Sequence, residues 1–158
     1  MSDETRNRGF SPDEVRTLAG VLDEIIPPRD DGRLPGAGAL GLARYVDEAL
    51  ENMPELRSMI GDGLAALNDL AARRSSRVFA ELSKQDRSEV MNELASTEHA
   101  FPPILILHVY AGYYQHARVI EALGIEPRPP HPKGYQMEAN DLTLLDPVRR
   151  RPKLYREC

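Results

Sequence analysis

The sequence predicts an all-α protein, an antiparallel bundle of about five or six helices followed by an extended, proline-rich C-terminal arm. Apolar residues recur at spacings of three and four along most of residues 1–124, which is the period of helices with one buried face. No segment alternates apolar and polar residues as a half-buried strand does. Of the 13 prolines, 6 follow Gly124, where the helical period ends.

Length and charge divide the chain in the same way. Its 158 residues suffice for one domain with a hydrophobic core. The net charge of -5 argues against a general role in nucleic-acid binding. Residues 1–124 hold 13 Lys/Arg and 20 Asp/Glu, whereas residues 125–158 hold 7 and 5. We therefore predict an acidic helical domain over 1–124 and a mildly basic arm over 125–158.

The first helix is predicted to begin after Ser11. Ser11 and Glu14 form an S-x-x-E capping box, and Pro12 suits the first helical position. Pro27–Pro28 should end the helix. The Gly- and Pro-rich stretch 27–41 lacks the phosphate-loop pattern and follows no strand, so we interpret it as a connector between helices.

Three further helices are predicted over about 39–52, 54–74 and 84–96, because each keeps an apolar residue every three or four positions. Pro54 should open the second of these, and Ser83 should cap the third.

A last long helix is predicted from Pro102–Pro103 to about Leu123, with Gly124 as its left-handed stop. Residues 100–117 carry no formal charge, but they include prolines, histidines and a glycine. This stretch is too polar for a bilayer span and suits a buried central helix.

This helix contains three tyrosines that divide between two faces. Tyr110 and Tyr114 share a face, while Tyr113 is turned by about 100° from Tyr114. We expect one face to pack in the core, and the other to be covered by the arm or by a partner.

The arm can be interpreted as a disordered tail, but it has more apolar and aromatic residues than a solvated tail needs. A polyproline segment that ends at Gly134–Tyr135, laid along the body or along a partner, fits better. The predicted partner interface consists of Tyr113, Tyr114, Pro129, Pro130, His131, Tyr135, Leu144, Leu145 and Tyr155.

No residue pattern predicts catalysis or metal binding. His108 and His116 lie eight positions apart, too far to chelate one metal without other ligands. The sequence has no H-E-x-x-H, no C-x-x-C and no dinucleotide fingerprint. Its one cysteine, Cys158, is the last residue and excludes an internal disulfide. We expect no catalytic, cofactor-binding or metal-ligating residue, and a binding or structural subunit rather than an enzyme.

Several motifs together resemble the gluconate 2-dehydrogenase subunit 3 family. They are "SPDEVRTLAGVLDEIIP", an "LPGA" loop, "FAEL", "GYY" and "ALGIEPRPPHPKGY". The most specific are Gly112-Tyr113-Tyr114 and the proline-rich ending at Gly134-Tyr135, and the resemblance covers about residues 10–135.

The resemblance implies a small, non-catalytic subunit of a flavin-dependent sugar or polyol dehydrogenase. The large subunit of such a complex is of the glucose-methanol-choline type and holds the FAD, and the small subunit supports its folding, stability or export. The resemblance also allows a cytochrome subunit in the complex.

Many members of that family begin with a twin-arginine signal, and none is visible in this sequence. We expect a cytoplasmic complex from the sequence as written. Two alternatives are export to the periplasm with a signal-bearing partner, and prior removal of a signal.

Two other functions are considered. A homo-oligomeric helical adaptor would assemble without a second gene product. A stand-alone protein that binds a metal or haem through His108 or His116 would be coloured or contain metal when purified alone.

Overall fold

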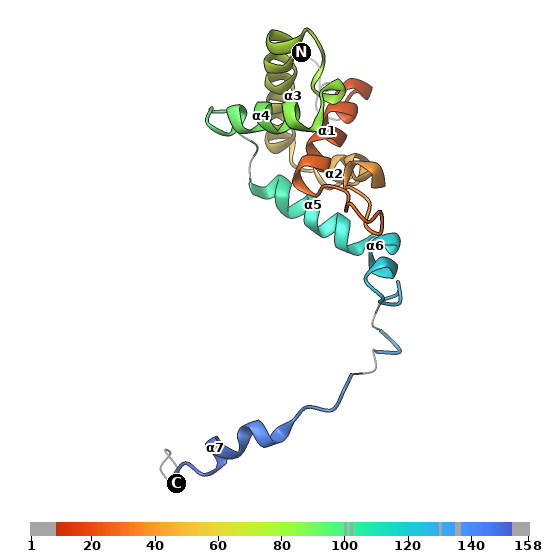
Figure 1. Ribbon diagram of the computed structural model, residues 1–158, viewed down its shortest axis with the longest axis vertical. Helices are drawn as coiled ribbons and strands as arrows, with labels where there is room; N and C mark the ends of the chain where they lie inside the picture. Colours follow the sequence, from red (N-terminus) through yellow and green to blue (C-terminus); the bar gives the residue numbers. More distant parts are fainter. Residues whose placement is uncertain (1–8, 100, 102, 130, 135–136, 153–158) are drawn as a thin grey trace. The chain divides into compact units, whose positions relative to one another are not determined.

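The computed structural model describes residues 9–99, 101, 103–129, 131–134 and 137–152. The chain divides into two compact units, Met1–Pro127 and Arg128–Cys158, and each is described by itself. The all-α class is confirmed, because the described residues form seven α-helices and no strand (Figure 1).

The first unit contains six of these helices and two short 3-10 turns. They follow one another as α1 (Pro12–Ile25), η2 (Gly38–Leu40), α2 (Leu42–Ala49), α3 (Pro54–Ser75), η3 (Phe79–Glu81), α4 (Lys84–Ala95), α5 (Pro103–Gln115) and α6 (Ala117–Ala122). Helix α1 packs against α2, α3, α4 and α5, so it is the central element of this unit.

The core of the first unit is mainly aliphatic. Its largest fully buried side chains are Tyr113, Phe79, Leu18, Leu22, Leu50, Ile60, Leu64, Leu67, Leu94 and Leu105. They come from α1, α3, α4, α5 and η3, and Leu50 directly follows α2. The burial of this apolar surface is the main force that holds the unit together.

The predicted cap of α1 is confirmed. The Glu14 amide donates to Ser11 Oγ at 3.3 Å, and the Ser11 amide donates to Glu14 Oε2 at 2.8 Å. Both bonds satisfy amides that have no partner within the helix. Pro54 opens α3 and Ser83 caps α4, also as predicted.

The connector between α1 and η2 is pressed against α1. The Gly38 amide donates to Asp23 Oδ1 at 2.8 Å, and the Ala37 amide donates to the Ile26 carbonyl at 3.0 Å. A Cβ at Gly38 would overlap the carbonyl oxygen of Ala19. The backbone therefore approaches α1 more closely than a residue with a side chain would allow.

The prediction of one long last helix is wrong, because α5 ends at Gln115 and α6 begins at Ala117. His116 lies between them with extended dihedrals, φ -71 and ψ 128. Its ring Nδ1 accepts from the Arg118 amide at 3.3 Å, so a side chain replaces the helical partner of that amide.

Gly124 ends α6 as predicted. It has φ +79, its amide donates to the Glu121 carbonyl at 2.9 Å, and the Ile125 amide donates to the Ile120 carbonyl at 3.1 Å. These are the two bonds of a Schellman motif, which requires a left-handed residue at this position.

The second unit contains one short helical segment, made of η4 (Leu142–Leu145) and α7 (Asp146–Arg149). Arg128 and Gly134 lie closer together than a continuous polyproline conformation between them would place them. The Arg128 guanidinium donates to the carbonyl oxygens of Pro129 and Gly134, at 3.3 and 2.7 Å. Six residues of polyproline would span about 19 Å, which is more than one arginine side chain can reach.

Candidate interaction surface

Helix α5 is positioned by one buried face. Leu105 and Val109 are completely buried and Tyr113 is 2% exposed. Gly112 lies against α2, where an added Cβ would come within 2.7 Å of the Tyr45 ring. This close approach of α2 and α5 needs a glycine, so the Gly112-Tyr113-Tyr114 motif has a structural reason.

Tyr113 also ties α5 to the connector after α1. Its hydroxyl donates to the Pro35 carbonyl at 2.9 Å, across 78 positions of the sequence. Burial, with a smaller contribution from Tyr114, raises the pKa of this hydroxyl above its ordinary value of 10.0. Tyr113 was predicted in the partner interface, but it lies in the core and fixes the orientation of the helix.

The opposite face of α5 is apolar and open to solvent. It consists of Ile106, Leu107, Tyr110 and Tyr114, which are 45%, 61%, 44% and 52% exposed. Their spacings of three and four place them in one stripe, and α5 contains no charged residue. We call these four residues the α5 stripe. The expectation of a buried central helix is thus wrong for this face.

The aromatic rings of the stripe hold one another in place. Tyr110 and Tyr114 stack with ring centroids 6.1 Å apart. Tyr113 meets the edge of Tyr114 at 5.2 Å and an interplanar angle of 82°. Tyr114 is therefore an exposed ring that is already restricted on two sides, and little rotamer freedom is left for a partner to remove.

Sequence reasoning identified Tyr114 and missed Ile106 and Leu107. Both aliphatic residues were read as core, because a spacing pattern does not say which of two apolar faces is covered. The available signal was that α5 has apolar residues on both faces.

The remaining residues of the predicted interface all belong to the second unit. Pro129, His131, Leu144 and Leu145 are exposed. Pro130, Tyr135 and Tyr155 lie outside the described residues.

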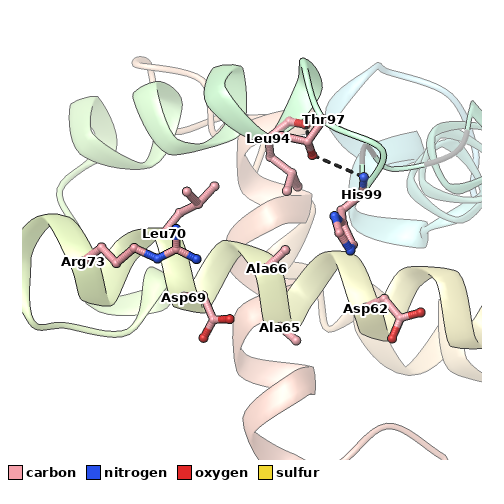
Figure 2. Close-up of a pocket in the computed structure, with 9 residues that line it drawn as sticks. All are labelled: Asp62, Ala65, Ala66, Asp69, Leu70, Arg73, Leu94, Thr97 and His99. Atoms are coloured by element: carbon pink, nitrogen blue, oxygen red, sulfur yellow. Dashed lines mark hydrogen bonds between the residues drawn. The ribbon is translucent and has the colours of Figure 1, made fainter.

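A groove of about 410 Å³ lies on the first unit between α3 and the end of α4 (Figure 2). Asp62, Asp69 and Arg73 line it from α3, and His99 lines it from the segment after α4, where its amide donates to Thr97 Oγ1 at 3.2 Å (Figure 2). The groove is open, and its polar side chains do not converge on one point (Figure 2). This arrangement provides neither a nucleophile with its base nor a set of metal ligands.

The two histidines considered as ligands differ in their surroundings. His116 Nδ1 is engaged with the Arg118 amide. His108 Nε2 is buried and has no hydrogen-bond partner among the described residues. Within the same residues, no group of three or more His, Cys, Asp or Glu side chains could hold a metal ion.

No helix in the described part of the chain combines the length and apolarity that crossing a bilayer requires.

Comparison with known families gives one match, to Gluconate 2-dehydrogenase subunit 3, over residues 12–137. The chain belongs to the gluconate 2-dehydrogenase subunit 3 family. The match begins at the first residue of α1 and covers the six helices of the first unit. Comparisons with curated proteins and with solved structures found no match. The family match ends before η4 and α7, so these two elements are not part of what defines membership.

Proposed function

We propose that this chain is the non-catalytic small subunit of a sugar dehydrogenase of the glucose-methanol-choline type. In this proposal it binds and stabilises the catalytic subunit, which holds the FAD. Membership of the gluconate 2-dehydrogenase subunit 3 family supports a role within a dehydrogenase complex. The observation that carries the proposal is the α5 stripe, an exposed apolar surface on a helix without charge.

Such a surface favours a protein partner. Apolar residues exposed as a continuous stripe are more typical of an interface than of a free surface. Tyrosines are among the residues that contribute most to binding energy, above all when their rings are already ordered. Tyr110 and Tyr114 meet both conditions.

The other predicted interface residues extend the proposal to the arm. Pro129, His131, Leu144 and Leu145 are exposed and available for contact. Pro130, Tyr135 and Tyr155 are proposed as contacts from the sequence alone. Tyr113 acts indirectly in this scheme, because it holds α5 in place from the core.

The test is to measure binding of the purified catalytic subunit to the chain and to two variants, Leu107→Asp and Tyr114→Asp. Each variant places a charge in the stripe, and we expect affinity to fall by about 30-fold or more. Met59→Asp on α3 is the matched control, because Met59 is 54% exposed but lies outside the stripe. It should bind like the unaltered chain.

Deletion of residues 125–158 tests the arm in the same assay, and we expect co-purification with the catalytic subunit to be lost. Unchanged binding of both stripe variants would contradict the proposed interface. Self-association of the chain alone, abolished by Leu107→Asp, would instead favour the homo-oligomeric adaptor.

A further inference from the structure

The helical segment of the second unit exposes its apolar residues. Leu142, Leu144, Leu145 and Val148 are 56%, 76%, 46% and 56% exposed. A short helical segment without any buried side chain gains no stability from apolar residues that stay in water. These four side chains therefore point to a surface that lies outside this unit.

The start of this segment is fixed by local hydrogen bonds. Asp141 Oδ1 accepts from the Thr143 amide at 3.0 Å and from Thr143 Oγ1 at 2.6 Å. These bonds cap the first turn. Pro147 then supports the first turn of α7, where its fixed φ suits the helix. The segment thus has a local preference for the shape in which its apolar residues are presented.

Charge is separated along the segment. Glu138, Asp141 and Asp146 come first, and Arg149, Arg150 and Arg151 follow. Arg149 pairs with Asp146 at 3.2 Å. The side chains of Arg150 and Arg151 form no hydrogen bond or ion pair within the described part of the chain. Two free guanidinium groups therefore lie directly after the apolar residues.

This arrangement fits a protein groove better than a membrane surface. The arm as a whole is mildly basic, but the three charged residues among its apolar side chains, Glu138, Asp141 and Asp146, are all acidic, so anionic lipid would repel the part that has to insert. A protein surface can complement the two parts of the segment separately: an apolar groove can bind the leucines, and carboxylates can bind the guanidinium groups.

We propose that residues 141–151 form a docking segment that inserts Leu142, Leu144, Leu145 and Val148 into an apolar groove of the catalytic subunit. An acidic patch at the end of that groove receives Arg150 and Arg151. This inference rests on the proposed function for the identity of the partner. The docking segment lies beyond residue 137, where the family match ends. In this proposal it is a second contact with the catalytic subunit, besides the contact made by the α5 stripe.

The experiment measures binding kinetics of the full chain on the immobilised catalytic subunit. The variants are Leu144→Asp/Leu145→Asp and Arg150→Glu/Arg151→Glu. The charge-matched control is Arg33→Glu/Arg77→Glu, which alters two exposed arginines of the first unit. We expect each segment variant to bind at least tenfold more weakly, and the control within twofold of the unaltered chain.

The two variants should differ in mechanism. The leucine variant should dissociate faster, whereas the arginine variant should associate more slowly and lose much of its salt dependence between 50 and 500 mM NaCl. Circular dichroism should show the same thermal unfolding for all variants, because the core residues of the first unit precede the segment.

The outcomes separate this inference from the proposed function. If the unaltered chain does not bind the catalytic subunit, the proposed function fails. If it binds and both segment variants bind equally well, the docking segment is wrong, together with the Leu144 and Leu145 contacts, and the proposed function stands on the α5 stripe. Binding to vesicles of phosphatidylcholine and phosphatidylglycerol, lost in Arg150→Glu/Arg151→Glu, would overturn the inference in favour of a membrane.

Discussion

Tyr113 joins two distant parts of the first unit through one hydroxyl. Tyr113→Phe keeps the ring in the core and leaves the Pro35 carbonyl without its donor. We expect the free energy of unfolding to fall by about 1 kcal/mol, measured by urea titration at pH 7. Tyr114→Phe is the matched control, since its hydroxyl has no hydrogen-bond partner in the described structure, and it should change little.

The contribution of Tyr113 to stability should also depend on pH. Because burial raises the pKa of the Tyr113 hydroxyl above 10.0, the unfolded chain loses this proton first as pH rises. Its contribution to stability is therefore complete below about pH 10 and declines above it. The stability difference between the unaltered chain and Tyr113→Phe should shrink in urea titrations between pH 9 and 11. A constant difference would contradict this account.

Two glycines allow a sharp comparison of backbone packing. Gly38→Ala would force a Cβ against the Ala19 carbonyl, and we expect a loss of about 1–3 kcal/mol. Gly61→Ala adds the same methyl group within α3, where the nearest atom is Glu14 Oε1 at 3.5 Å. Removing a glycine from a helix there should stabilise the chain by about 0.5–1 kcal/mol. Thermal unfolding should therefore give a lower melting temperature for Gly38→Ala and a higher one for Gly61→Ala than for the unaltered chain.

At the scale of elements, Asn68 links α1, α3 and η3. Its Nδ2 donates to Thr17 Oγ1 at 3.0 Å, and its Oδ1 accepts from the Phe79 amide at 3.0 Å. Asn68→Ala would leave both buried groups unpaired and should cost about 1–3 kcal/mol. Asn92→Ala on the exposed side of α4 is the control and should be neutral or slightly stabilising. Equal urea midpoints for the two variants would exclude this network as a stabilising link.

The helix boundaries that could be predicted are those that a few neighbouring residues determine. Ser11 with Glu14, Pro54 and Gly124 each act through bonds or dihedrals within one turn, so the sequence alone identifies them. The break at His116 could not be predicted this way. The apolar period continues across it, and only the observed backbone shows that the His116 ring caps a new helix.

The candidate surface was predictable only in part for a related reason. The exposure of Tyr114 could be predicted because the helical period places it on a different face from Tyr113, so both rings could not lie in the core. Ile106 and Leu107 were missed because burial depends on which elements pack against α5, and that information is tertiary. The buried face of α5 is covered by Pro35, which bonds Tyr113, and by Tyr45, which packs on Gly112. Both lie more than 60 positions before their partners in the sequence.

At the scale of the whole molecule, the two units have different relations between sequence and burial. The first unit has one buried apolar core, and the α5 stripe is an apolar surface that it leaves exposed. The second exposes Met137 at 85% and Leu144 at 76%, and it has no buried residue among those described. In the proposed complex, the first unit folds around its own core and presents the α5 stripe, and the second unit supplies further contacts to the catalytic subunit.

This division leads to a prediction about the complex. If the chain stabilises the catalytic subunit, adding it at about 100 times the dissociation constant should raise the unfolding free energy of that subunit by about 2.7 kcal/mol. Differential scanning fluorimetry of the flavin signal measures the shift, and Leu107→Asp, which is expected to bind about 30-fold more weakly, should give a clearly smaller shift at the same concentration. The turnover rate per bound FAD should stay the same with and without the chain, because none of its residues is proposed to touch the substrate. A turnover rate that rises with the chain present, at constant FAD content, would mean that it takes part in the reaction itself.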